Sequence, residues 1–384
     1  MINYKVYTSF KELPDCWDAF VFHDVFLQSN YIQALQQASP NNIQWFYLGV
    51  FDADVLVGIA IIQRVQLYLK DMFRQTKVSC VKSFFQDLVS KVLKGNVLVV
   101  GNLTHTGQHG LFFNQDKISQ PQFLEAILSA LSDIEKMIKT NQNKKIRVIM
   151  FKDYFENDSI HLQQTIFDSL KLHKVTAQPN MMLFIRPEWV NIDNYIENLN
   201  KKYRDRYKRA RKKLSALHTV ELNMETIQAE SKTLYMFYRN VSNNAKFNTF
   251  LLPENHFYSL KYHLKENFKV YGYYLNDKLI GFYSLILNNE NLETYFLGYD
   301  EAYQYTNQLY LNMLYDMLMF GIYNRFKTVV YARTAMEIKS SIGAEAKPML
   351  VYMKHTTPFL NSILKQLFKL MNPTQDWEER HPFK

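Results

Sequence analysis

Two stretches, WFYLGVFDADVLVG at residues 45–58 and FKVYGYYLNDKLIG at residues 268–281, decide the fold of this 384-residue chain. They align at a constant offset of 223 residues, which places Gly58 on Gly281. Each stretch has an apolar run, a short polar turn and a second apolar run, the pattern of a β-hairpin. A hairpin that recurs in this way indicates a chain built from two copies of one unit.

Further elements recur in the same order around the two hairpins. In each half an amphipathic helix is followed by a buried strand and then by a proline-led apolar strand. The predicted segments are 123–137, 146–151 and 179–183 in the first half, and 311–322, 328–331 and 348–352 in the second. This order predicts a mixed α/β fold with two tandem domains. We place the domains at 1–186 and 187–356, followed by an amphipathic helix and tail at 357–384.

The net charge of +9 is concentrated in one short segment. Residues 201–213 carry nine Lys or Arg and one Asp, so the rest of the chain is close to neutral. Apolar residues repeat here at spacings of three and four, which predicts a helix with one buried face. The other face carries Lys202, Arg206, Arg209 and Lys213. A cluster of this density attracts polyanions such as RNA, a nucleotide-linked precursor or anionic lipid, and the alternative is a solvated helix face.

Composition argues against several classes of protein. The two cysteines, Cys16 and Cys80, predict neither a disulfide framework nor a zinc site. His105 and His109 are separated by a glycine, so we expect no metal site there. No signal-peptide pattern opens the chain, and no apolar run approaches the roughly 20 residues that span a bilayer. We therefore expect a cytoplasmic protein, with peripheral attachment to the inner membrane face left open by the C-terminal helix.

The chain resembles the GNAT acyltransferase superfamily in its tandem form, which includes the Fem-type aminoacyltransferases and the BioF2-like acetyltransferase group. Residues 202–210 resemble the basic helix that opens the second domain, and residues 297–299 resemble its central strand end. Ile-Lys-Ser-Ser-Ile-Gly at 338–343 is similar to the Phe-Lys-x-x-Phe-Gly signature of Fem-type second domains. The resemblance covers nearly the whole chain. It implies two GNAT-like domains that transfer an acyl or aminoacyl group onto an amine.

The chain departs from this family at the turn that holds the pyrophosphate of acyl-CoA. GNAT enzymes carry there an Arg/Gln-x-x-Gly-x-Gly/Ala turn at a helix N-terminus. The corresponding residues 298–308 contain no Gly-x-Gly and no basic residue, and Asp300 and Glu301 would repel an anion. The standard route to acyl-CoA is therefore not expected. The donor stays open between acyl-CoA and aminoacyl-tRNA.

The resemblance assigns the leading catalytic candidate to Lys339, which matches the signature lysine and implies a role at the oxyanion or a phosphate. Arg333 and Glu337 follow the predicted strand 328–331, at the strand end where ligands of α/β sheets collect. Arg333 suits a carboxylate or phosphate. The alternatives are a solvated helix lysine at 339 and an i, i+4 ion pair between Arg333 and Glu337.

Two further candidates lie near the family's acyl-binding turn. Tyr299 is a workable acid near a leaving group, and Asn307 is a candidate for binding the substrate. With 26 tyrosines in the chain, no single one is distinctive by type.

Two hypotheses of different class follow from these features. The first is an N-acyltransferase that moves an acyl or aminoacyl group onto an amine of an anionic or cell-envelope precursor, with a small, lipid-linked or RNA substrate. The second is a non-catalytic module that binds RNA or anionic lipid through the basic helix. The first predicts that Lys339, Arg333 and Tyr299 surround one pocket, and the second predicts a flat exposed stripe.

Overall fold

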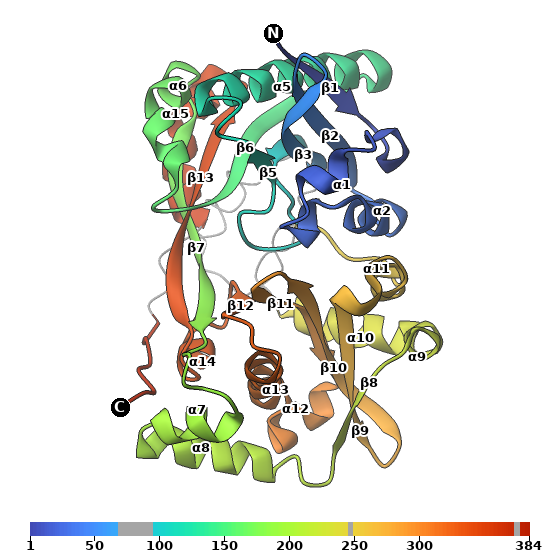
Figure 1. Ribbon diagram of the computed structural model, residues 1–384, viewed down its shortest axis with the longest axis vertical. Helices are drawn as coiled ribbons and strands as arrows, with labels where there is room; N and C mark the ends of the chain where they lie inside the picture. Colours follow the sequence, from blue (N-terminus) through green and yellow to red (C-terminus); the bar gives the residue numbers. More distant parts are fainter. Residues whose placement is uncertain (68–94, 245–248, 372–376) are drawn as a thin grey trace, which may run out of the picture. The chain divides into compact units, whose positions relative to one another are not determined.

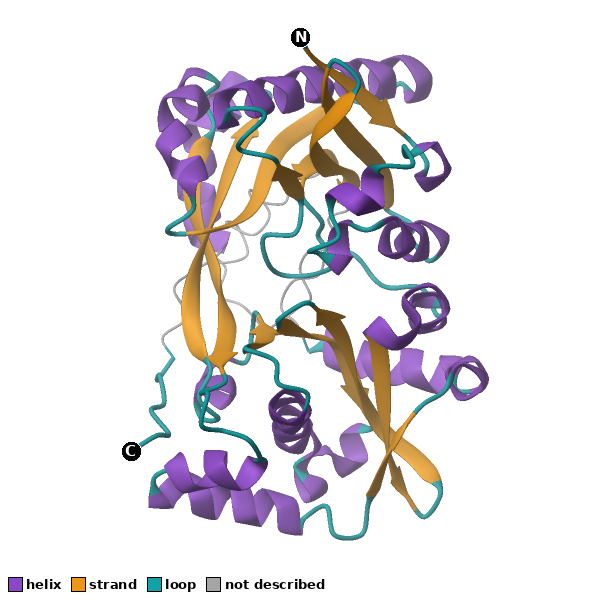
Figure 2. Ribbon diagram, viewed as in Figure 1, coloured by secondary structure: helices purple, strands orange, loops and turns teal. Residues whose placement is uncertain are grey.

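The computed structural model describes residues 1–67, 95–244, 249–371 and 377–384, and Cys80 lies outside them. The chain divides into two units. Unit 1 contains the described residues of 1–178, 246–252 and 348–374, and unit 2 contains those of 179–245, 253–347 and 375–384. Figure 2 shows that strands form a sheet in each unit and that helices pack on it, which confirms the mixed α/β class.

The sheet of unit 1 has the strand order β1-β2-β3-β4-β6-β13. Neighbouring strands are antiparallel except β4 and β6, which are parallel, and β5 pairs with β3. The strands are β1 (Ile2–Tyr7), β2 (Ile43–Asp52), β3 (Val55–Leu67), β4 (Gly95–Val100), β5 (Leu111–Phe113), β6 (Ile146–Phe155) and β13 (Glu345–His355). The helices are α1 (Trp17–Phe20), α2 (Ser29–Gln37), α5 (Gln120–Gln142), α6 (Gln164–Ser169) and α15 (Pro358–Met371).

The sheet of unit 2 repeats this topology as β8-β9-β10-β11-β12-β7, with only β11 and β12 parallel. Its strands are β8 (His218–Glu221), β9 (Phe268–Leu275), β10 (Lys278–Asn288), β11 (Asn291–Tyr299), β12 (Thr328–Ala332) and β7 (His173–Phe184). Its helices are α7 (Ile192–Asn198), α8 (Lys201–Lys212), α9 (Met224–Ala229), α10 (Ser231–Asn243), α11 (His256–Leu264), α12 (Glu301–Asn307), α13 (Leu309–Tyr323) and α14 (Met336–Ser340). The two units therefore share one strand order.

The two predicted hairpins, β2–β3 and β9–β10, are confirmed and pair in the same register. Val50 lies opposite Gly58 in the first hairpin, and Tyr273 lies opposite Gly281 in the second. One residue on, both ladders shift at the same position and so carry the same β-bulge. The equivalence of residues 223 apart thus extends to an irregularity of the backbone.

The glycine that ends each repeated stretch lies beneath the helix that crosses its sheet. A Cβ on Gly58 would lie 2.6 Å from the Phe123 ring of α5, and a Cβ on Gly281 would lie 2.9 Å from Met313 of α13. Both helices confirm predicted segments, and α5 begins with a capping box made by Ser119. A glycine at this strand position lets the helix approach the sheet closely.

The last strand of each sheet comes from the other half of the sequence. Strand β13, near the C-terminal end, pairs with β6 in unit 1, whereas β7 pairs with β12 in unit 2. Figure 1 shows this exchange as a red strand among the blue and green strands and a green strand beside β12. Unit 1 therefore completes its sheet with a strand from a distant part of the sequence, whereas the part of β7 that pairs with β12 directly precedes α7 within unit 2.

Two further findings concern membrane-spanning helices and metal ligands. Among the residues that the structure describes, no helix is long and apolar enough to cross a membrane. In the same residues no group of three or more His, Cys, Asp or Glu is placed to hold a metal ion. Nδ1 of His109 instead lies 2.7 Å from the Asp24 carboxylate.

We predict that Gly298→Ala destabilises unit 2 more than Gly281→Ala does. A Cβ on Gly298 of β11 would lie 2.3 Å from the backbone carbonyl carbon of Phe237 in α10, whereas the nearest atom at Gly281 is the flexible end of Met313. Overpacking costs about 1–3 kcal/mol, and backbone yields less readily than a side chain. Thermal unfolding of the two variants measures the difference, and equal midpoints would contradict the close approach of α10 to β11.

Candidate functional site

The basic segment forms α8, as predicted. Asn200 caps this helix because its side-chain oxygen accepts the backbone N–H of Tyr203 at 3.4 Å. Tyr203 and Ala210 are buried on one face, whereas Lys202 and Arg209 are exposed on the other. The helix thus has the two-faced character that the spacing predicted.

One cation of α8 points into the protein rather than towards solvent. Nη1 of Arg211 donates to Oδ1 of Asp316 at 2.7 Å, and the hydroxyl of Tyr273 donates to the same carboxylate. Asp316 lies in α13 and is only 5% exposed. Burial raises the pKa of Asp316, and the Arg211 charge opposes this rise. The ion pair therefore fixes α8 against α13 and orients its other cations away from the core.

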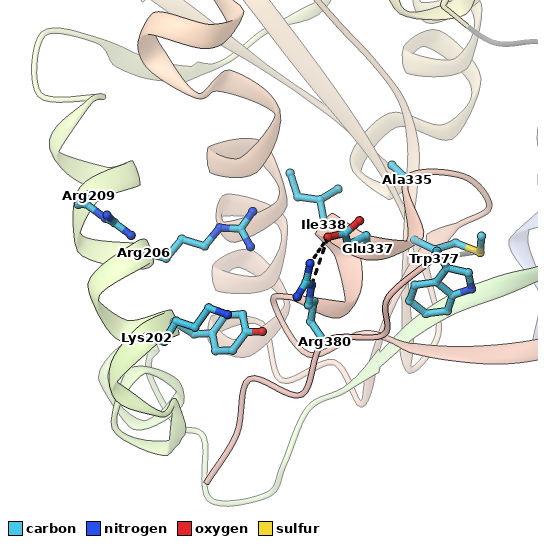
Figure 3. A pocket seen from close by; sticks show the side chains of 10 residues that line it. Lys202, Arg206, Arg209, Ala335, Glu337, Ile338, Trp377 and Arg380 are labelled. Carbon is cyan, nitrogen blue, oxygen red and sulfur yellow. Dashed lines mark hydrogen bonds and ion pairs between the residues drawn. The ribbon is translucent and has the colours of Figure 1, made fainter. Parts of the chain in front are cut away.

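Three of those cations line a pocket of about 680 Å³ within unit 2. Lys202, Arg206 and Arg209 lie on one side, and α14 with the preceding Ala335 lies on the other. Figure 3 shows Arg206 reaching from α8 towards the side that carries Glu337. The full lining is Lys202, Tyr203, Arg206, Arg209, Ala335, Met336, Glu337, Ile338, Trp377 and Arg380. A pocket of this size suits a small molecule or one part of a larger substrate.

Glu337 is the carboxylate among these lining residues, and it is ion-paired with Arg380. Nη2 of Arg380 contacts Oε1 of Glu337, and Nε donates to the same oxygen at 3.2 Å (Figure 3). The side chains of Glu337 and Arg380 are 53% and 25% exposed. Water screens a pair this accessible, so a ligand can separate it at small cost.

Lys339 is buried, with 4% of its surface exposed, which excludes the alternative of a solvated helix lysine. Its Nζ donates to the carbonyl oxygens of Tyr331 at 2.5 Å, Ala332 at 3.3 Å and Arg333 at 2.7 Å. Burial lowers the pKa of Lys339 to about 7. Lys339 therefore ties α14 to the end of β12. The three carbonyls match the three N–H donors of the protonated amine.

Comparison with known proteins shows which folds this chain is similar to. Residues 201–339 match the domain family described as "Acetyltransferase (GNAT) domain". The crystal structure of FemX is similar over 96% of this chain and 100% of its own, at 10% identity and a TM-score of 0.56. A tandem GNAT protein from the clavulanic acid biosynthesis pathway, solved without AcCoA, is similar over 93% of this chain and 99% of its own, at 8% identity and a TM-score of 0.50. Residues 201–339 thus match a GNAT domain, and the fold of the chain is similar to that of tandem GNAT proteins. No curated protein matches it by sequence.

The β11–α12 turn does not fit the anion cradle that GNAT enzymes use to bind acyl-CoA. Asp300 caps α12, and its carboxylate accepts the N–H of Ala302 at 3.1 Å. The same carboxylate lies 3.3 Å from Nζ of Lys278. A carboxylate therefore occupies the helix N-terminus where the family's motif would present N–H groups to a pyrophosphate.

The remaining candidates lie outside the pocket lining given above. Asn307 donates through Nδ2 to the Lys213 carbonyl at 3.1 Å, and the Lys213 ammonium lies 3.5 Å from the Tyr305 carbonyl. The structure thus brings Asn307 and Lys213 together. Tyr299 is half-buried at the end of β11, and burial raises its pKa, so it keeps its proton at neutral pH. Arg333 is half-buried on the turn that Lys339 holds.

Sequence reasoning did not single out Trp377 and Arg380, which complete the pocket wall from the C-terminal tail. Both lie in a short aromatic and charged stretch after the last amphipathic helix. This stretch has no hydrophobic periodicity, so the sequence does not predict where it packs. Arg211 was also not distinguished from its eight basic neighbours. The sequence signal for Arg211 was Asp316, the one charged residue in the mainly apolar run 309–322, because a buried carboxylate needs a cationic partner.

We predict that the stability of the protein depends on the titration of Lys339. The folded state binds this proton less tightly than the unfolded chain, whose lysine pKa is near 10.5. Stability therefore rises with pH between about 7 and 10.5, by at most about 1.4 kcal/mol per pH unit for one proton. Lys339→Met removes this rise.

Thermal midpoints of the wild type and Lys339→Met, measured from pH 7 to pH 10, provide the test. The difference between the two proteins should grow with pH. Lys201→Met, at an exposed position, serves as the control and should run parallel to the wild type. Parallel curves for Lys339→Met as well would show that the three carbonyls keep the amine protonated.

Proposed function

We propose that the protein transfers an acyl or aminoacyl group onto an amine of an anionic precursor, such as an intermediate of the cell envelope. The observation that carries this proposal is the pocket in which cations of α8 face the carboxylate of Glu337. Such a pocket binds the anionic part of a substrate and offers a base for its amine. The GNAT fold supports acyl transfer as the class of reaction.

Each candidate side chain has a role consistent with its position. Lys202, Arg206 and Arg209 bind the anion, and Glu337 accepts the proton that the attacking amine must lose. Lys339 acts through the turn that it holds, because its N–H groups bond to backbone carbonyls. Its direct contact with an oxyanion stays a prediction, as do anion binding by Arg333 and proton donation by Tyr299. Asn307 and Lys213 are proposed to contact a more extended substrate.

The second candidate, a polyanion-binding module, is favoured by the cations of α8 that lie outside the pocket lining. Lys201, Lys208 and Lys212 are exposed. Such cations bind RNA or the anionic inner face of a membrane, and the binding free energy grows with the number of contacts that they make. Peripheral attachment at that face is therefore part of this candidate.

Incubation with labelled donors separates the two functions. The purified protein is given acetyl-CoA or aminoacyl-tRNA together with an extract of small and lipid-linked amines, and the products are identified by mass spectrometry. Transfer from either donor supports the enzyme and identifies the donor class. Retention of RNA or lipid without transfer from either donor supports the binding module.

We predict that Glu337→Gln lowers the turnover number about 10²–10⁴-fold, the usual contribution of a general base, and leaves KM nearly unchanged. Glutamine keeps the shape of the side chain and a hydrogen-bonding oxygen but cannot take the proton. Glu378→Gln is the matched control, since Glu378 also pairs with Arg380, at 2.5 Å, but does not line the pocket. Equal turnover numbers in the wild type and Glu337→Gln would show that Glu337 is not the general base.

We predict that reversing Lys202, Arg206, Arg209 and Lys213 to Glu abolishes retention on heparin at low salt. Binding by these cations should weaken steeply as salt is added. The control reverses Lys136, Lys139, Lys144 and Lys145, near the C-terminal end of α5, and changes the net charge equally. If both variants lose retention alike, binding reflects total charge and α8 has no special part in it.

A further inference from the structure

The described tail, residues 377–384, belongs to unit 2 and is anchored there by the ring of Phe383. The ring centroid of Phe383 lies 5.4 Å from that of Trp189 and 6.0 Å from that of Tyr195. The guanidinium of Arg186 lies 4.5 Å from the same centroid. Aromatic and cation–π contacts of this kind are each favourable, so together they hold the tail in a defined place.

Gly343, the glycine of the 338–343 signature, packs directly against the Phe383 ring. Its φ of 103° belongs to the region that favours glycine, and a Cβ here would lie 2.4 Å from the Phe383 ring. The position therefore needs glycine for two reasons, its backbone and the ring that lies on it. The signature sequence and the tail are thus parts of one arrangement.

Backbone hydrogen bonds tie the tail to the start of α8. The Asn200 N–H donates to the Pro382 carbonyl at 2.9 Å, and the Lys384 N–H donates to the Asn198 carbonyl at 3.1 Å. Leu199 and Phe383 form an antiparallel bridge between these bonds. Because Asn200 is the N-cap of α8, the tail contacts the helix that carries the pocket's cations.

The same tail places two side chains in the pocket wall. The Arg380 N–H donates to Oγ of Ser340 at 3.0 Å, and this bond fixes the backbone from which the guanidinium extends. Trp377 adds an aromatic surface. Arg380 joins Lys202, Arg206 and Arg209, so four cations surround a pocket whose lining holds one carboxylate. Several guanidinium groups around one site favour a phosphate or diphosphate, which they bind through paired N–H donors.

We propose that the C-terminal tail is a working part of the substrate site: Arg380 binds a phosphate or diphosphate of the ligand, and Phe383, seated on Gly343, is the positioning residue that holds Arg380 in place. This inference rests on the anion pocket of the proposed function. A phosphate that takes Arg380 also separates it from Glu337, because their exposed ion pair is weak. Anion binding would then release the carboxylate that acts as the base.

Calorimetric titration of the full chain with inorganic pyrophosphate at low salt tests the proposal. Arg380→Ala should weaken binding about tenfold or more, the effect of losing one charge-assisted hydrogen bond, and Arg380→Lys should restore part of the loss. Phe383→Ala should weaken binding by a similar factor although its ring does not line the pocket. His381→Ala, whose exposed side chain lies on the same tail, should bind as the wild type does.

Two further variants keep the outcomes distinct. Phe383→Leu retains an apolar side chain on Gly343, so it should fold and bind better than Phe383→Ala, and circular dichroism verifies the fold of each. Wild-type affinity in Arg380→Ala or in a folded Phe383→Ala would overturn the role of the tail and leave the α8 pocket in place. If the wild type does not bind pyrophosphate, or the fourfold α8 variant binds it equally well, the anion pocket of the proposed function fails as well.

Discussion

The buried carboxylate of Asp316 is the constraint on which the site depends. A charge in the middle of an apolar helix is tolerated only with partners, and the structure supplies Arg211 and Tyr273. Arg211 lies on α8 and Tyr273 on β9, so one side chain of α13 connects three elements. The orientation of α8 follows from this connection. With Arg211 turned inward, Lys202, Arg206 and Arg209 are left facing the pocket.

Much of the fold was predictable because the hairpin repeat carries two signals. Its alternation of residues predicts the strands, and its constant offset predicts a duplicated unit. The alternation around Gly58 and Gly281 specifies strand, turn and strand in each copy, and the shared bulge shows that even a backbone irregularity repeats. The exchange of β7 and β13 was not predictable in the same way. Both are apolar, proline-led strands, and nothing in their composition says which sheet edge each one joins.

In the candidate site, too, features set by local sequence pattern were predictable, whereas contacts between residues far apart in the sequence were not. The charged face of α8 could be read from spacing, whereas the burial of Lys339 depends on a side chain that folds back onto the end of β12. Glu337 pairs with Arg380, which is 43 residues away in the sequence. A helical spacing of four suggested Arg333 as its partner instead. Contacts made by a tail without periodic pattern give no signal until the chain is folded.

The exchanged strands also bear on synthesis of the chain at the ribosome. The sheet of unit 1 pairs β6, which ends at Phe155, with β13, which ends at His355. At translation rates of about 5–20 residues per second, the roughly 200 residues between them take on the order of 10–40 s to make. During that time the backbone N–H and C=O groups on one edge of β6 lack the partner strand that they have in the folded protein. The sheet of unit 1 therefore stays incomplete in the nascent chain until β13 has been made.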